Sequence, residues 1–560
     1  MKKLFLLLLF IPLFSFSQNY NADVIIYGGT SSGIAAAIES SRLGNEVILI
    51  EPTSRIGGLT TGGLGQTDIG NKQVIGGIAL EFYQNIKKYY DSPDNWVWQK
   101  KYEYKDRGQT RSSISEDAMW TFEPSAALVV FNQMLDSEKI KIFYNERLER
   151  IKGVKKVKNK IKHIIMESGI SFSGIVFIDA SYEGDLLASS GVSYTVGRES
   201  NSKYGETLNG KQPNSSGVTL KNKSSKNSEN HNFIYGVDPY MIAGDPNSGL
   251  LPYINEGGAG VEGEGDKAIQ AYCFRMTLTD HPVNRIPFKK PDNYNELNYE
   301  LLFRNYESAK VNIEDMYSYG DPLVPWINSP MPNRKTDTNN QKGFSTDFIG
   351  QNWNYPEANY EERKKIVDLH LQYQQGLMWT LAYHPRIPKK VRDKVSIWGT
   401  CKDEYDREDG WQNQLYIREA RRMISDYVMT QKNCERLEIV NDPVGMAAYG
   451  MDSHNVKRYV NDLGFVENEG NVEAYVEKPF PISYRSIIPN KNECENLIIP
   501  VCLSASHIAF GSIRMEPVFM VLGQSSAIIA SLVIEKKISV QDLNYKKLKT
   551  ILTEKGQILN

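Results

Sequence analysis

The sequence predicts an α/β fold, and three features of the chain indicate it. Residues 23–51 run through an apolar strand, a glycine-containing turn, a small-residue helix and a second apolar strand. Residues 140–179 hold short β-rich runs separated by basic turns, and residues 497–524 hold an apolar strand followed by an apolar helix. Strands that alternate with helices in this way are typical of a sheet covered by helices.

Residues 1–18 are predicted to be a secretory signal peptide. Met1 is followed by two lysines, by an apolar run from Leu4 to Phe16 and by Ser17. The apolar run is shorter than the ~20 residues that span a bilayer, and no Arg-Arg pair precedes it. We therefore expect cleavage near Ser17 or Gln18, export to the periplasm or the medium, and no membrane span in the mature chain.

Charge and cysteine content exclude several classes of function. The 560 residues carry a formal net charge of −2, so no overall field attracts nucleic acid, and we expect no nucleic-acid partner. The 5 cysteines are widely scattered without a C-x-x-C pair. This spacing predicts neither a disulfide framework nor an iron–sulfur cluster, and we expect no metal site.

The segment 23–51 has the pattern of a dinucleotide-binding βαβ unit. Gly28 permits a tight turn, Gly33 lets the helix pack closely on the strand, and the helix N-terminus directs N–H groups at a pyrophosphate. Thr30 occupies the position of the usual middle glycine. Glu51 follows Gly28 by 23 positions, near the roughly 20 expected of a carboxylate that binds ribose hydroxyls. The predicted cofactor contacts here are Gly28, Gly29, Thr30, Ser31, Ser32, Gly33, Glu51 and Pro52.

A loop of small residues follows the second strand. Seven of the nine residues from 57 to 65 are glycine or threonine, and Arg55 stands just before them. Such a loop suits backbone that passes against phosphates or a flat ring system, although a flexible solvent loop has a similar composition. The predicted cofactor contacts in this loop are Arg55, Gly57, Gly58, Thr60, Thr61 and Gly62.

Residues 140–179 are predicted to form an antiparallel meander whose last strand re-enters the main sheet. It ends in small and acidic residues from Asp179 to Asp185, and we expect Ala180 to contact the cofactor there. A helix cap by Ser181 or Asp185 explains the same residues equally well. The first part of the cofactor domain is then residues 19–198.

Residues 199–470 are predicted to be a mixed α+β substrate domain. It opens with a polar surface excursion over 199–231, and its strongest helix patterns lie at 360–383 and 415–430. The second pattern places Arg418 and Arg422 on one helix face, where they either bind an anionic or polyhydroxyl ligand or form structural ion pairs. Asp337 either lines the substrate cleft or caps a turn.

Residues 471–560 are predicted to complete the cofactor domain. An apolar strand at 497–501 precedes a Ser-Ala-Ser-His turn, and Pro517 marks the start of a long helix. The free N–H groups of that helix would face the cofactor, and Ser512, Met515 and Pro517 are predicted contacts.

Four residues are predicted to be catalytic. Histidine side chains in general titrate near neutral pH, so His507 and His454 suit proton transfer, although each also fits a structural turn. Arg485 and Arg514 would polarise a carbonyl or hold a carboxylate, and Arg514 would otherwise pair with Glu516 or Asp185. Tyr484 is a secondary candidate for a proton relay.

Several strings resemble one family. These are residues 28–37, 56–65, 179–185, 451–455 and 501–517, and they are similar to FAD-dependent oxidoreductases related to the heterodisulfide reductase A subunit. The resemblance implies a glutathione-reductase-like FAD-binding Rossmann domain, discontinuous in sequence, with the mixed α+β substrate domain inserted between its halves. Some relatives bind a [4Fe-4S] cluster, from which this chain departs in its scattered cysteines.

Three functions follow as hypotheses. The first is an exported FAD enzyme that transfers hydride between flavin N5 and a small organic substrate, possibly derived from carbohydrate, with an unknown electron acceptor. The second is a flavin-dependent reductase of an unsaturated carboxylate or a carbonyl. The third is a non-catalytic binding protein that keeps the flavin fold.

Overall fold

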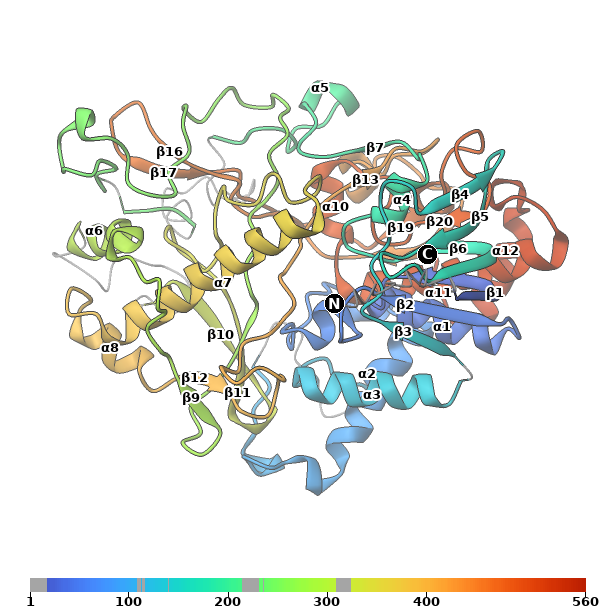
Figure 1. Ribbon diagram of the computed structural model, residues 1–560, viewed down its shortest axis with the longest axis horizontal. Coiled ribbons are helices and arrows are strands. Elements are labelled where there is room, and N and C mark those ends of the chain that lie inside the picture. The colour runs from blue at the N-terminus through green and yellow to red at the C-terminus, as the bar shows by residue number, and fades with distance from the viewer. Residues whose placement is uncertain are drawn as a thin grey trace, which may run out of the picture.

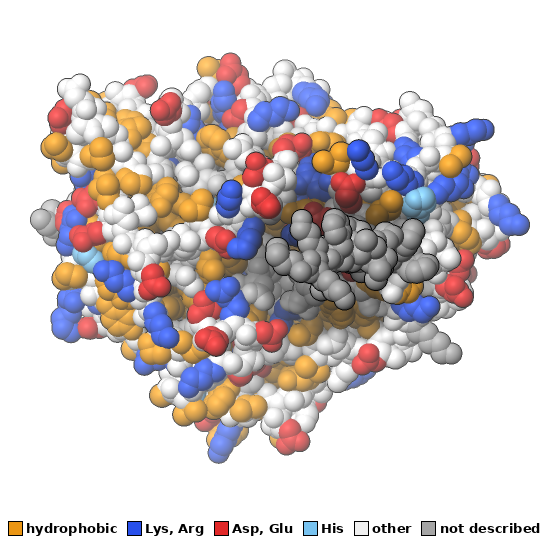
Figure 2. Space-filling view, viewed as in Figure 1, with side chains coloured by type: hydrophobic (Ala, Val, Ile, Leu, Met, Phe, Trp, Pro, Cys, Tyr) orange, Lys and Arg blue, Asp and Glu red, His pale blue; other side chains and the backbone are white. Residues whose placement is uncertain are grey.

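The computed structural model describes residues 18–107, 112, 116–138, 140–213, 231–234, 236–308 and 324–560. Two lobes lie side by side, with the main sheet on the right of Figure 1 and a second sheet on the left. Nearly all of the predicted signal peptide, and about half of the predicted excursion at 199–231, lie outside the described residues. On the face seen in Figure 2, acidic and basic side chains are interspersed.

The main sheet contains the predicted βαβ unit. Its strand order is β3-β2-β1-β6-β5-β4, with β20 added beside β6. The strands β3, β2, β1, β6 and β20 are parallel, whereas β4 and β5 are antiparallel. The bounds are β1 (Asn19–Tyr27), β2 (Val47–Glu51), β3 (Lys141–Tyr144), β4 (Val154–Val157), β5 (Lys160–Ile165), β6 (Ser171–Asp179) and β20 (Leu497–Ile498).

This sheet corrects two details of the prediction. Residues 141–144 are not part of the meander: a helix precedes them, so the chain crosses over and they pair parallel with β2. The strand expected at 497–501 has only two paired residues, Leu497 and Ile498, and these pair with β6. The antiparallel meander is confirmed for β4, β5 and β6.

Helices from both ends of the chain cover the main sheet. Helix α11 packs along α1 so closely that a Cβ at Gly523 would lie 2.1 Å from the Ser32 carbonyl oxygen. The C-terminal segment therefore returns to the N-terminal unit, as the sequence predicts. The bounds are α1 (Ser31–Arg42), α2 (Gly77–Asp91), α3 (Pro124–Asp136), α4 (Asp185–Ser189), α10 (His507–Ile513), α11 (Glu516–Lys536) and α12 (Tyr545–Glu554).

Among the described helices, α11 alone is long and apolar enough to cross a membrane by length and composition. Its most apolar window is 89% buried inside the protein. Because it packs on α1, α2 and β14 (Pro443–Ala447), it is a core helix of this lobe.

The second lobe is built on a five-stranded sheet of order β10-β11-β8-β12-β9. Helix α7 covers it and spans Tyr360–Tyr383, which confirms the helix predicted at 360–383. Asn359 caps α7 by accepting from the Glu362 N–H, and the Glu362 side chain accepts from the Asn359 N–H in return. The bounds are β8 (Met276–Thr279), β9 (Arg285–Pro287), β10 (Trp326–Met331), β11 (Lys335–Asn340), β12 (Gly399–Cys401), α6 (Glu300–Ser308) and α8 (Lys389–Val395).

Short two-stranded sheets lie outside the two large sheets. Met429, Val444 and Met451 pack in the core of the first lobe, although they lie within the segment 199–470 assigned to the substrate domain. The predicted domain boundaries stay predictions. The remaining bounds are β7 (Tyr194–Thr195), β13 (Arg422–Met423), β15 (Met451–Ser453), β16 (Lys457–Val460), β17 (Val466–Glu469), β18 (Val472–Ala474), β19 (Phe480–Ser483), α5 (Asn201–Tyr204) and α9 (Gln431–Cys434).

The helix predicted at 415–430 is wrong. The segment is extended and irregular, and its residues 422–423 pair with β7. Arg418 and Arg422 therefore do not share a helix face: Arg418 binds Asp347, and Arg422 binds Glu199. These buried ion pairs hold the segment extended, and of the two roles considered for the arginines the structural one applies.

The close approach of the β1 turn to α1 gives a stability test. A Cβ at Gly33 would lie 1.9 Å from the Gly28 carbonyl oxygen, so Gly33→Ala forces the turn and helix apart. We expect a loss of about 1–3 kcal/mol in the free energy of unfolding, measured by urea denaturation.

Gly258→Ala is the matched control, because a Cβ there meets no atom within 4 Å. It is expected to stay within about 0.5 kcal/mol of the parent. Equal stabilities of the two variants would contradict the close packing.

Candidate active site

The turn after β1 is shaped for close approach. Gly28 has φ +101°, and a Cβ there would lie 2.6 Å from the Ser181 N–H nitrogen. Thr30 caps α1, since its Oγ1 accepts from the Gly33 N–H at 3.3 Å and donates to the Ala180 carbonyl at 2.8 Å. The residue in the middle glycine position thus ties the turn to the end of β6, beside the predicted contact Ala180.

Glu51 ends β2 beside this turn. Its carboxylate accepts from the N–H of Gly29 and of Thr53, both at 2.7 Å. Burial raises the pKa of Glu51 to about 7, against these hydrogen bonds. A carboxylate fixed at this place suits the ribose hydroxyls of a dinucleotide. Pro52 follows it, partly exposed.

The glycine-rich loop carries a guanidinium suited to phosphate. Arg55 Nε donates to the Thr61 carbonyl at 3.1 Å, whereas its Nη2 is buried and has no hydrogen-bond partner within the described part of the chain. Gly57 has φ +94°, and a Cβ there would lie 2.2 Å from Thr61. A Cβ at Gly62 would lie 2.5 Å from the Gln414 side chain. The loop is therefore compact, and the unpaired N–H of Arg55 fits a pyrophosphate oxygen.

A carboxylate that the sequence analysis did not select stands opposite this loop. Glu516, the first residue of α11, accepts from Ser31 Oγ at 2.5 Å, Tyr182 OH at 2.7 Å and Thr60 Oγ1 at 3.0 Å. Burial raises its pKa. The signal in the sequence was an acid in the first turn of a helix, which alone is no more than a capping preference.

The predicted C-terminal cofactor contacts lie close to Glu516 in the sequence. Met515 and Pro517 are its buried neighbours, and Ser512 donates to the Tyr449 carbonyl at 2.6 Å. Ser32 and Gly58 also lie in this region, where Ser32 Oγ is buried without a partner among the described atoms. The turn, the two carboxylates and the unpaired Arg55 N–H together fit an adenine dinucleotide.

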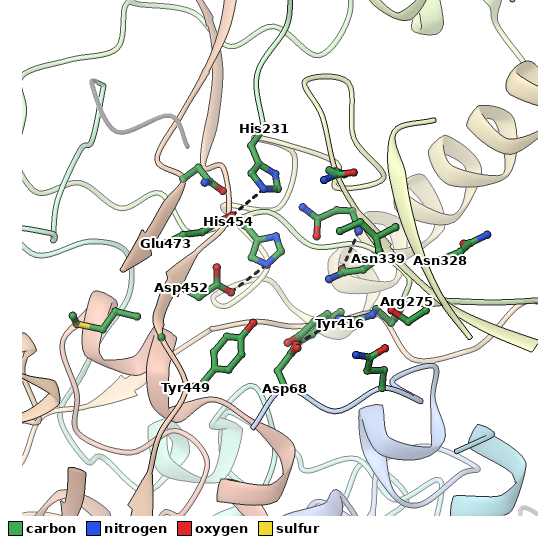
Figure 3. Close-up of a pocket in the computed structure, with 18 of the residues that line it drawn as sticks. Asp68, His231, Arg275, Asn328, Asn339, Tyr416, Tyr449, Asp452, His454 and Glu473 are labelled. Atoms are coloured by element: carbon green, nitrogen blue, oxygen red, sulfur yellow. Dashed lines mark hydrogen bonds and ion pairs between the residues drawn. The ribbon is translucent and has the colours of Figure 1, made fainter. Parts of the chain in front are cut away.

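A cavity of about 690 Å³ lies between the two lobes, beyond the glycine-rich loop (Figure 3). Gln66 and Asp68, just after that loop, form part of its wall. Strands β10 and β11 contribute Asn328 and Asn339 on another side. The cavity therefore adjoins the cofactor segment directly.

His454 lines this cavity, and Asp347 binds one of its ring nitrogens. Its Nδ1 lies 2.8 Å from Asp347 Oδ2, and its Nε2 lies 3.5 Å from Asp452 Oδ2. Burial works to raise the pKa of Asp347, yet Arg418 and His454 hold it below the ordinary value. Burial also works to raise the pKa of Asp452 near Nε2, yet His454 and Arg514 hold it below the ordinary value, so a carboxylate flanks each ring nitrogen of His454.

His454 belongs to a closed chain of contacts that we call the charged ring. Arg514 donates from Nη2 to Asp452 at 2.6 Å and from Nη1 to the Tyr416 hydroxyl at 2.7 Å. On the other side, Arg418 Nη2 lies 2.9 Å from Asp347, and its guanidinium stacks 4.5 Å above the Tyr416 ring. The members of the ring are Tyr416, Arg514, Asp452, His454, Asp347 and Arg418.

Two further pairs complete the polar wall. His231 Nε2 lies 2.9 Å from Glu473 Oε1, and Glu473 stands directly across the strand pair from Asp452. Arg275 binds Asp337, and its Nη1 lies 3.9 Å from Asp68. Asp337 is fully buried behind Arg275, so it orients that guanidinium and does not line the cavity.

The family follows from a comparison with known protein families. A model described as "FAD dependent oxidoreductase" matches residues 23–552. The chain belongs to this family. It is an FAD-dependent enzyme, and the dinucleotide that the cradle fits is FAD. No curated protein matches the chain.

The solved structures similar to this oxidoreductase are distant. A 3-ketosteroid-Δ4-(5α)-dehydrogenase from Rhodococcus jostii is 14% identical with a TM-score of 0.20, over 32% of this chain and 50% of its own. A bacillithiol disulfide reductase from Staphylococcus aureus is 17% identical with a TM-score of 0.18, over 29% and 38%. A thioredoxin reductase from T. acidophilum is 15% identical with a TM-score of 0.17, over 28% and 34%. The matched part is thus half or less of each neighbour's length.

The sequence predicts no iron–sulfur cluster, and the positions of the five cysteines bear on this prediction. All five are buried, and within the described residues no group of three or more His, Cys, Asp or Glu side chains is placed to hold a metal ion. The cofactor of this oxidoreductase is FAD.

The structure brings together two of the four predicted catalytic residues, His454 and Arg514. His507 does not line the cavity: it is buried in α10, with Nδ1 2.8 Å from Glu419 and Nε2 3.0 Å from Ser453. It contacts the side of β15 opposite Asp452. A catalytic role for His507 stays a prediction, and its position suits holding β15 in place.

Arg485 and Tyr484 lie away from the cavity. Arg485 binds Asp442 at 2.9 Å, and its side chain is 44% exposed. The Tyr484 hydroxyl donates to the Val540 carbonyl. Sequence reasoning missed Tyr416, Asp68 and Arg275, which belong to no motif and meet only through the tertiary fold.

Glu51 provides a test of the cofactor cradle. The ribose hydroxyls need an ionised carboxylate, and its pKa of about 7 means that part of the population must first lose a proton. We expect the Glu51 contribution to FAD affinity to rise between roughly pH 6 and 8. Glu51→Gln is expected to bind FAD about tenfold more weakly and to lose this rise, as measured by titration calorimetry.

Glu46→Gln, at an exposed glutamate just before β2, serves as the control and should bind FAD like the parent. The comparison between variants cancels the titration of other groups, Glu516 included. A parallel pH dependence in the parent and Glu51→Gln would count against the assigned role.

Proposed function

We propose that this protein is an exported FAD-dependent oxidoreductase that oxidises a secondary or primary alcohol of a small polyhydroxylated molecule. The observation that carries the proposal is His454, whose Nε2 faces a cavity adjoining the cofactor loop while Asp347 holds its Nδ1 at 2.8 Å. An imidazole that a carboxylate holds in place at the wall of a cavity suits removal of a hydroxyl proton.

Bound FAD supplies a hydride acceptor for the carbon that carries the hydroxyl. Glu51, Arg55 and the N-terminus of α1 would hold the dinucleotide. His454 takes the hydroxyl proton on Nε2, and Asp347 stabilises the imidazolium that results. Asp452, itself bound by Arg514, helps to fix the position of the His454 imidazole, so little rearrangement is needed.

The lining of the cavity supports a neutral, hydroxyl-rich substrate. Asn328, Asn339 and Gln66 offer amide groups that both donate and accept, as hydroxyls do. Arg275 is already engaged by Asp337, and Arg514 by Asp452. These pairs argue against the reductase alternative, in which Arg514 and Arg485 hold a carboxylate, and Arg485 lies away from the cavity.

The finer relation to the heterodisulfide reductase A subunit is part of this proposal and rests on the strings quoted above. The inserted substrate domain of a glutathione-reductase-like fold is also part of this proposal, and the separate five-stranded sheet supports it.

The proposal predicts that a polyol or sugar bleaches the flavin. Purified holoprotein, mixed anaerobically with a panel of polyols, aldoses, enoates and carboxylates, is expected to lose its absorbance near 450 nm (about the ordinary flavin band) with a polyol or sugar. His454→Gln is expected to slow this reduction about a hundredfold or more, since it removes the base.

His163→Gln is the matched control, because His163 lies in β5 of the main sheet and does not line the cavity. Its reduction rate should match the parent. Reoxidation of the reduced flavin by enoates, together with no bleaching by polyols, would favour the reductase instead.

Export is tested by the N-terminus of the mature protein. We expect the chain recovered from the periplasm or medium to begin near Gln18 or Asn19, which mass spectrometry of the intact protein determines. Recovery of the full-length chain in the cytoplasm alone would contradict the signal peptide.

A further inference from the structure

We propose that Tyr416 is a second catalytic residue, whose O–H donates a hydrogen bond to the substrate oxygen from which His454 takes the proton. This rests on the proposed function, because it assigns both groups to the same substrate. Tyr416 belongs to no motif of the sequence, and it forms part of the cavity wall (Figure 3).

Tyr416 stands where the cofactor loop meets the cavity. Its ring packs with Leu59 and Leu64 of the glycine-rich loop, and the residue also lines the cavity. It is 7% exposed, so it is shielded from bulk solvent. A group at this junction is placed beside both the cofactor segment and a substrate in the cavity.

Contacts on three sides hold the phenol ring of Tyr416 in place. The backbone N–H of Tyr416 donates to the Cys273 carbonyl at 2.9 Å, which ties it to the segment before β8. Arg418 stacks on one ring face at 4.5 Å, and the leucines pack against the side chain. A side chain held in this way needs no reorganisation when a substrate binds.

The hydroxyl group has its own proton available. Arg514 Nη1 donates to the Tyr416 oxygen at 2.7 Å, so that oxygen acts as an acceptor in the ring. Among the described residues no acceptor is recorded for the Tyr416 O–H. The Asp452 carboxylate accepts a hydrogen bond from Arg514 Nη2 rather than from the Tyr416 hydroxyl.

The surrounding charges make this phenol a strong donor. Burial raises the pKa of Tyr416, while Arg514 and Arg418 act in the opposite direction, so the phenol stays protonated at neutral pH. A donor that itself accepts a charge-assisted hydrogen bond is polarised toward giving its proton. It therefore suits an oxygen on which negative charge develops.

The two groups divide one proton transfer between them. When the O–H bond of the substrate breaks and the N–H bond forms on His454 Nε2, the oxygen becomes negatively charged. Tyr416 stabilises that charge without transferring its own proton. The charged ring links both side chains through Arg514 and Asp452, so their positions are set together.

A coloured oxyanion tests the donor directly. Holoprotein is titrated with p-nitrophenolate, at a pH where the probe is ionised, and binding is followed by the shift of its absorbance. We expect the parent to bind it and Tyr416→Phe to bind it at least tenfold more weakly, because one hydrogen bond to a charged oxygen is lost. Binding by Tyr416→Phe within twofold of the parent, or no binding by the parent, overturns the proposal.

Tyr294→Phe is the matched control. It removes a tyrosine hydroxyl that bonds to Thr380 under α7 and does not line the cavity. It should bind the probe like the parent. If Tyr416→Phe does not fold, 3-fluorotyrosine at position 416 replaces it: a more acidic phenol is expected to bind the probe more tightly, and unchanged or weaker binding overturns the proposal.

A second readout separates this inference from the proposed function. With the polyol that bleaches the flavin, Tyr416→Phe is expected to lower the rate of flavin reduction about a hundredfold and to leave FAD affinity unchanged. Failure of every polyol to bleach the flavin, with loss of probe binding in Tyr416→Phe, would refute the alcohol substrate and leave the donor in place. Normal reduction by Tyr416→Phe would refute its catalytic role alone.

Discussion

The packing of α11 against α1 is the constraint on which the rest of the structure depends. The two helices come from opposite ends of the chain, and their small residues allow backbone contact at Gly523 and Ser32. This contact brings Glu516 to the start of α1, where its carboxylate joins Ser31, Thr60 and Tyr182. Three segments around the predicted cofactor site are thereby held together by one side chain.

The charged ring continues this order from the glycine-rich loop to the cavity. Burying so many charges costs solvation free energy, and each member therefore has a partner of opposite charge or a hydrogen bond. Removing one member would leave another buried charge without compensation. The ring is thus better understood as a means of holding side chains in place than as a source of stability.

Local signals allowed the prediction of the cofactor half of the site. The turn at Gly28 and the carboxylate at Glu51 follow from glycine conformation and strand spacing, both of which are encoded within a few residues. The helix expected at 415–430 failed because its polar periodicity came from arginines that turn inward to separate acids. Periodicity alone does not distinguish a solvated face from buried ion pairs.

The substrate half depended on contacts between distant segments. His454 and Arg514 were selected because they lie in distinctive strings, but Tyr416 and Asp68 lie in ordinary sequence and gain meaning only from their neighbours. His507 was selected for its chemistry, and the fold places it behind β15 with Ser453 and Glu419. A strand presents alternate residues to opposite faces, so neighbours in sequence serve different surfaces.

The amide side chains Asn328 and Asn339 stand on β10 and β11, whereas every member of the charged ring lies outside those two strands. Substitutions along the hairpin can therefore alter which molecule fits while the proton-transfer groups stay as they are. Under the proposed function, substrate selection and proton transfer thus belong to separate elements of the fold.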